Sequence, residues 1–294
     1  MRHESCKLNG NSNIAKNKCE EYYTMRIALG ISYHGSAYHG WQSQTGLACI
    51  QTYLEQAISQ VANHPIALSC AGRTDKGVHA LGQVVNFDST AQRSQRAWLL
   101  GCNSYLPADI RINWVQEVDS SFHARFSAFA RRYYYIIYNH HLKNALWNQY
   151  TSHCYYPLNE NAMQSAAQHL IGEHDFSSFR AASCQAKSAC REMQHIKIRR
   201  QGCYVIIDIQ ANAFLHHMVR NISAVLMAIG TGKKPIDWAK EVLLAQDRKS
   251  ADVTATANGL YLTQVFYPEN FALPPAENDF FRIPFILGDL ESKN

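Results

Sequence analysis

The alternation of apolar and polar residues along the chain predicts a series of half-buried strands and amphipathic helices. Within residues 26–33, Ile27 and Leu29 face one side while polar or small residues face the other, as in a strand with one face against a core. The same pattern predicts strands over 66–70, 84–87, 112–118, 133–138, 194–199, 203–211 and 260–267, and helices over 50–61, 94–100, 163–170, 216–229 and 238–244. Strands and helices that alternate in this way indicate a fold that mixes α and β structure.

Between two of these strands lies a polar stretch bounded by glycines, G-R-T-D-K-G-V-H-A over residues 72–80. Glycine allows tight turns that other residues resist. The loop places Asp75 between the cations Arg73 and Lys76, which favour an ionised carboxylate that can act as a nucleophile. An Asp followed by Gly is also ordinary turn chemistry, so the spacing alone leaves both interpretations open.

Basic residues and aromatic rings alternate in a second stretch, over residues 122–139. It contains Arg125, Arg131 and Arg132 among phenylalanines and tyrosines. Rings that stack on bases and arginines that bind phosphates are typical of proteins that bind flexible RNA. The alternative is a strand with buried rings, and the two can coexist because alternate residues face opposite sides. A net charge of +5 permits a polyanionic partner without requiring one.

Composition narrows the class of protein. Hydrophobic residues make up 47% of the 294 residues, which excludes wholesale disorder, and no apolar run approaches the ~20 residues that cross a membrane. Nine cysteines without a C-x-x-C pair predict reduced thiols in a cytoplasmic protein. If His216 and His217 belong to the predicted helix, they point about 100° apart, which argues against a shared metal ion.

The loop over residues 72–80 resembles the active-site signature of the TruA family of tRNA pseudouridine synthases. The likeness extends over about residues 25–268 through Y-H-G-S-A-Y-H-G-W-Q, D-F-S-S-F-R-A and H-H-M-V-R-N-I. It implies an α+β pseudouridine synthase fold, in which two ferredoxin-like halves share a central, mostly antiparallel sheet with the active-site cleft between them. The expected organisation is a flexible extension (1–24), a half with the catalytic loop (25–125), a second half (126–268) and a tail (269–294).

The resemblance also implies a reaction and its residues. Uridines at positions 38, 39 and 40 of the tRNA anticodon arm would become pseudouridine, without a cofactor or metal, in a homodimer. Asp75 matches the catalytic aspartate, which attacks either C1′ of the sugar or C6 of the base, and Arg220 matches its basic partner. Tyr133 matches the residue that stacks on the target base, and Leu260 the apolar wall of the pocket. Arg73 is our choice for the side chain that fills the stack when the base is extruded.

Further basic residues are candidate phosphate contacts: Arg93, Arg125, Arg180, Lys187 and Arg191. Lys76 stands where many bacterial members carry a small residue, so a synthase that acts on other tRNA uridines is the nearest alternative. A non-catalytic RNA-binding module would not need Asp75 with a matching Arg220. A hydrolase with an aspartate nucleophile would need a general base and often a metal cluster, whose spacing is not seen in the sequence.

Overall fold

The computed structural model describes residues 24–274. The extension predicted over 1–24 lies outside the described residues except for its last residue. The tail predicted over 269–294 is described only to residue 274.

A single ten-stranded sheet runs through the described part of the chain, in the order β4-β1-β3-β10-β5-β9-β8-β7, with β2 beside β3 and β6 beside β5. Its strands are β1 (Met25–Tyr33), β2 (Ser69–Cys70), β3 (His79–Ser89), β4 (Ile110–Val118), β5 (Ala130–Asn139), β6 (Ser152–Cys154), β7 (Gly172–Asp175), β8 (Cys190–Gln201), β9 (Tyr204–Ala211) and β10 (Leu260–Phe266). Only the pairs β3–β10 and β5–β6 are parallel among these strands. The expected α+β fold with a mostly antiparallel sheet is confirmed.

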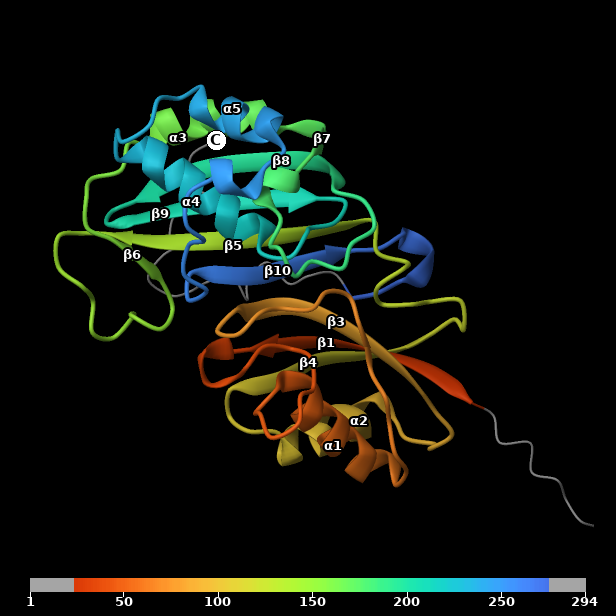
Figure 1. Cartoon of the computed structure of the whole chain (residues 1–294). Helices are drawn as coiled ribbons and strands as arrows, with labels where there is room; N and C mark the ends of the chain where they lie inside the picture. Colours follow the sequence, from red (N-terminus) through yellow and green to blue (C-terminus); the bar gives the residue numbers. More distant parts are fainter. Residues whose placement is uncertain (1–23, 275–294) are drawn as a thin grey trace, which may run out of the picture.

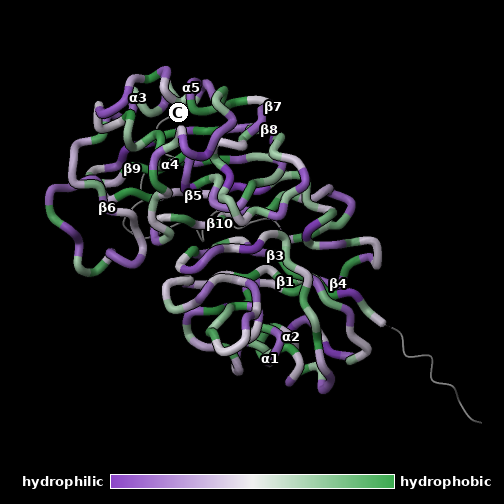
Figure 2. The backbone as a smooth tube through the Cα atoms, viewed as in Figure 1, coloured by the Kyte–Doolittle hydropathy of each residue, from purple (hydrophilic) through white to green (hydrophobic). Residues whose placement is uncertain are grey.

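Two groups of helices cover the sheet (Figure 1). The helices are α1 (Ile50–Ala62), α2 (Gln95–Tyr105), α3 (Glu160–Ala167), α4 (Met218–Gly230) and α5 (Trp238–Ala245). Helices α1 and α2 pack together beside β4, whereas α3 packs on α4 and β8 at the other end of the sheet. Figure 2 shows hydrophobic stretches along the central strands and along α4, whose residues are mostly buried. No helix among residues 24–274 is long and apolar enough to cross a membrane.

The last strand, β10, lies in the middle of the sheet rather than at its edge. It pairs with β5 on one side and, through Tyr261 and Leu262, in parallel with the start of β3 on the other. The backbones come so close there that a Cβ on Gly82 would lie 2.2 Å from the carbonyl oxygen of Thr263. The seam therefore requires glycine, and it joins the segment 25–125 to the segment 126–268 in one continuous sheet.

Several predicted boundaries differ from the structure, and the strand predicted over 84–87, for example, is the longer β3. The helix predicted over 216–229 begins at Met218, because His217 has a left-handed backbone conformation with φ of 62°. The helix predicted over 94–100 continues to Tyr105, and the Ser94 side chain caps it by accepting a hydrogen bond from the Ala97 amide. The strand predicted over 66–70 is reduced to Ser69–Cys70.

Candidate active site

Asp75 lies on the loop between β2 and β3, and a neighbouring loop clamps its backbone. The amide of Trp41 donates to the carbonyl oxygen of Thr74 at 2.9 Å. Gly40 has φ of 93°, and a Cβ there would lie 2.6 Å from the same carbonyl oxygen. Only glycine allows both this conformation and this approach. The nucleophile candidate is therefore held by the segment Y-H-G-W over residues 38–41.

Buried polar side chains in the core fix the Asp75 loop through hydrogen bonds. The hydroxyl groups of Tyr33 and Thr74 lie 2.7 Å apart in the core. The side-chain amide of Gln83, which is fully buried in β3, donates to the carbonyl oxygen of Gly72 at 2.6 Å. Buried polar groups that are satisfied in this way rigidify a structure. Sequence reasoning missed Tyr33 and Gln83, because neither lies in the motif that contains Asp75.

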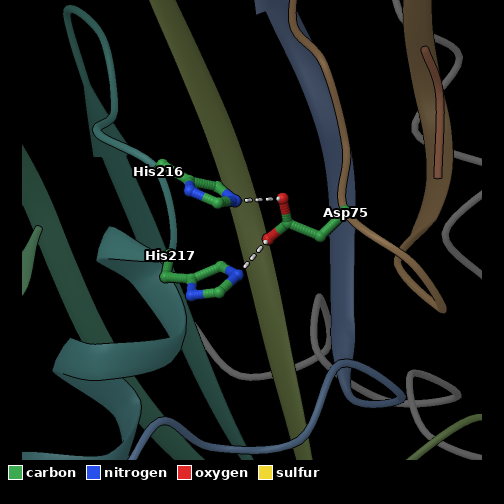
Figure 3. Close-up of side chains that lie close together, drawn as sticks. All are labelled: Asp75, His216 and His217. Atoms are coloured by element: carbon green, nitrogen blue, oxygen red, sulfur yellow. Dashed lines mark ion pairs between the residues drawn. The ribbon is translucent and has the colours of Figure 1, made fainter. Parts of the chain in front are cut away.

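The carboxylate of Asp75 faces three basic side chains from the other part of the sequence, two of which are drawn in Figure 3. The Nε2 atoms of His216 and His217 lie 3.0 Å and 3.3 Å from its two oxygens. Nη1 of Arg220, in the first turn of α4, lies 3.6 Å from Oδ2. The predicted proximity of Asp75 and Arg220 is therefore present, and two histidines that were not predicted complete the group.

The argument against a shared ion at His216 and His217 was wrong in its premise, because neither residue is helical. Both precede α4, and the left-handed conformation of His217 turns its ring to the same side as that of His216. The ring centroids lie 4.0 Å apart. One ligand atom from each histidine and one from Asp75 all lie within 4.8 Å of one another, so these three residues could hold a metal ion.

The carboxylate of Asp75 faces the guanidinium of Arg220 and the imidazole rings of His216 and His217. The guanidinium of Arg220 is oriented by a 2.8 Å hydrogen bond from its Nε to the carbonyl oxygen of Ala255. Burial lowers the pKa of His217, which the charge of Asp75 opposes. His217 is therefore mainly neutral near pH 7, and Arg220 is the constant counter-charge. The hydroxyl of Ser183 lies 3.2 Å from Nδ1 of His216 and orients that ring.

The two sequence neighbours of Asp75 have a different arrangement from the predicted one. Arg73 and Lys76 are both exposed, and Nζ of Lys76 lies 3.3 Å from Nε2 of His39. Within residues 24–274, none of the ion pairs of Asp75 involves Arg73 or Lys76. The expectation that these two cations hold the carboxylate is not what the structure shows, and Arg73 remains available for contact with a ligand.

Tyr133 and Leu260 lie on the adjacent central strands β5 and β10. The ring of Tyr133 is buried and meets Phe214 edge-on, with centroids 5.0 Å apart. Its hydroxyl lies 3.7 Å from the position of a Cβ on Gly72, which places it beside the Asp75 loop. Burial raises the pKa of Tyr133, so its phenol stays neutral. Leu260 is buried opposite Tyr135 in the β5–β10 pair, in the same hydrophobic core as Tyr133.

The arginines of the stretch over 122–139 mostly have structural roles. Arg131 is buried and donates to four carbonyl oxygens, including those of Ala71 and Asn212. Arg132 binds the buried carboxylate of Asp208 through Nε at 2.7 Å. For these two residues the interpretation as a buried strand is the correct one. Arg125 is exposed, with its guanidinium over the ring of Phe126.

The other candidate phosphate contacts differ in how free their side chains are. Arg180 donates to the carbonyl oxygens of Cys184 and Ala186, and thereby shapes its own loop. Arg191 donates to the carbonyl of Ser188, and Arg93 to that of Val61. Lys187 is exposed on the same loop as Arg180. All five remain predictions as RNA contacts.

Comparison with known proteins gives a consistent result over most of the chain. A family model described as tRNA pseudouridine synthase matches residues 30–127 and 166–268. The chain is 56% identical over 250 residues to tRNA pseudouridine synthase A of Pseudoalteromonas atlantica, covering 85% of this chain and 95% of that protein. The proteins of the same name from Yersinia pseudotuberculosis and Coxiella burnetii are 54% and 56% identical over 250 and 249 residues, with the same two coverages.

Proposed function

Because this chain belongs to the tRNA pseudouridine synthase family, we propose that it converts uridine in tRNA to pseudouridine, with Asp75 as the nucleophile. The observation that supports the role of Asp75 is its carboxylate, held on a rigid loop and facing Arg220 at 3.6 Å. A carboxylate that is fixed in position beside a guanidinium is oriented to attack without reorganisation.

In the proposed reaction the bond between C1′ and N1 breaks, the base turns, and a bond forms between C1′ and C5. The proton on C5 is lost and N1 gains a proton, so the mass of the nucleotide does not change. Asp75 forms the transient covalent bond, to C1′ or to C6, and is released when the base is rejoined. Tyr133 offers a flat, neutral ring on which the extruded base can stack, with Leu260 as the apolar wall.

A base in a stem must leave the helix before Asp75 can reach it, at a cost of a few kcal/mol. Arg73, exposed two residues before Asp75, is the side chain that we propose fills the vacated stack. Its lack of an ion pair with Asp75 in the described part of the chain supports this role, because the guanidinium is not engaged by the carboxylate.

The finer parts of the proposal rest on the resemblance to the TruA family. They are the target positions 38, 39 and 40 in the anticodon arm, a homodimer, a cytoplasmic location, and the phosphate contacts Arg93, Arg125, Arg180, Lys187 and Arg191. Because Lys76 stands where many bacterial members of the family carry a small residue, a different set of tRNA uridines is the alternative substrate.

The experiment is to incubate the full chain with an unmodified tRNA transcript and to map pseudouridine by chemical tagging and primer extension. We expect mass-neutral conversion at one or more of the three positions. Conversion at other positions would support the alternative substrate set. Tight tRNA binding without any conversion, under conditions in which a related synthase is active, would instead indicate a non-catalytic RNA-binding module.

A further inference from the structure

The three ligand atoms around Asp75 have the arrangement of a small metal site. Two imidazole nitrogens lie 3.0 Å and 3.3 Å from separate oxygens of one carboxylate. Zinc binds nitrogen and oxygen at about 2.0–2.2 Å, so ligands at neighbouring corners of a zinc tetrahedron lie about 3.4 Å apart. A Zn²⁺ ion could therefore enter with only small movements of the three side chains.

The surroundings also support the ring orientation that a metal needs. Nδ1 of His216 lies 3.2 Å from the hydroxyl of Ser183, so this nitrogen can carry the proton and leave the Nε2 lone pair for an ion. Coordination then requires a change of tautomer at Nε2, and no co-reactant.

Positive charge near the site weakens cation binding, and the types of ligand determine which metal the site prefers. Arg220 and the N-terminus of α4 both place positive charge beside Asp75. Mg²⁺ prefers six oxygen ligands, whereas two imidazoles and one carboxylate favour zinc or a similar transition metal. The site would therefore bind Zn²⁺ reversibly and discriminate against Mg²⁺.

We propose that Asp75, His216 and His217 form a binding site for one transition-metal cation of the Zn²⁺ class. A bound ion occupies the carboxylate that the substrate must reach, so it competes with tRNA and inhibits the enzyme. The inhibition rests on the proposed function of Asp75, whereas the binding does not.

Binding is tested on the full chain without RNA, by titrating Co²⁺ as a spectroscopic substitute for Zn²⁺ and then displacing it with Zn²⁺. We expect one ion per chain with the intense visible absorption of low-coordinate cobalt, and no displacement by millimolar Mg²⁺. The variants are His216→Gln and His217→Asn, and Asn tolerates the left-handed backbone at position 217. Each should weaken binding by about tenfold or more.

The matched control is His141→Gln. His140 and His141 form a second adjacent histidine pair, with ring centroids 4.2 Å apart, but carry no ion pair to a carboxylate among the described residues. This variant should bind Co²⁺ as the wild type does. If it loses the signal, or if His216→Gln and His217→Asn bind as well as the wild type, the proposed site is wrong.

Inhibition is measured as the Zn²⁺ concentration that halves each protein's own rate, at several tRNA concentrations. We expect this concentration to rise with tRNA, and to be about tenfold higher or more in the two site variants than in the wild type and the control. Equal sensitivity of all four proteins would overturn the proposal. A wild type that is inactive in metal-free buffer would refute the proposed function, and the Co²⁺ titration would still decide the site.

Discussion

His79 offers a quantitative test of how the two parts of the sheet are joined. Its ring is almost fully buried, and its Nδ1 accepts a hydrogen bond from the Gly35 amide at 3.0 Å. Its Nε2 lies 3.1 Å from the carbonyl oxygens of Gln149 and Asn258. One neutral imidazole thus links the loop after β1, the loop before β6 and the turn before β10. A second proton would have to go to Nδ1, which already accepts a hydrogen bond.

Protonation of His79 should therefore destabilise the fold in acid. Burial, together with the charge of the stacked His34, lowers the pKa of His79 to about 4. The other rings against it, Tyr150 and Tyr261, are phenols that add no positive charge. Because the unfolded chain binds this proton more tightly, the stabilisation is complete above about pH 6.5 and is lost as the pH falls toward 4.

The magnitude follows from the two pKa values. With a pKa of about 6.5 in the unfolded chain and about 4 in the fold, the loss at pH 5 is about 2 kcal/mol relative to pH 7.5. The assay is urea unfolding of the wild type and of His79→Gln at pH 5 and at pH 7.5. For each protein the change in the free energy of unfolding between the two pH values is determined, and the two changes are compared. Gln does not titrate, so the variant should lose about 2 kcal/mol less than the wild type, whatever its stability at pH 7.5. Equal losses in the two proteins would refute the reasoning.

Four further predictions concern the reaction and RNA binding. Asp75→Asn should abolish turnover with tRNA affinity nearly unchanged, and activity within tenfold of the wild type would exclude Asp75 as nucleophile. Tyr133→Phe should still bind tRNA, whereas Tyr133→Ala should lose ~1–3 kcal/mol of stacking in a binding assay; normal turnover of both would place Tyr133 outside the pocket. Lys187→Ala should reduce the log–log salt slope of tRNA binding by roughly 0.7–0.9, the value of one phosphate contact, and an unchanged slope would remove Lys187 from the interface. Arg73→Ala should slow a paired stem uridine much more than an unpaired one, and equal slowing of both would refute the role in base extrusion.

The parts of the site that the sequence could predict are those carried by contiguous motifs. Asp75 stands in a nine-residue string, and Arg220 in H-H-M-V-R-N, so the resemblance located both. The structure adds that the two side chains face each other across the fold. The side chains that support the Asp75 loop could not be found in this way. Gln83 is one of several polar residues in β3, and its hydrogen bond to Gly72 depends on the pairing of β2 with β3.

The order of the strands in the sheet could also be predicted only in part from the sequence. Periodicity identified the final strand, but nothing in residues 260–267 indicates that it lies between β3 and β5. The parallel contact with β3 involves only Tyr261 and Leu262, and it depends on the close backbone approach at Gly82. Such a contact is a property of the assembled sheet, because neither strand's pattern of apolar residues changes when its neighbour does.

The histidine pair shows how one backbone angle can change a chemical conclusion. Hydrophobic periodicity assigns residues 216–229 to one helix, and within a helix the two rings would diverge. Periodicity reports which face is buried, but not where the first hydrogen-bonded turn begins. Histidine is one of the few residue types that adopt the left-handed conformation at moderate cost. At His217 this conformation precedes a helix that begins at Met218, two residues later than predicted. The same angle brings two imidazoles to Asp75, so a strained residue beside the nucleophile candidate is itself an indication of function.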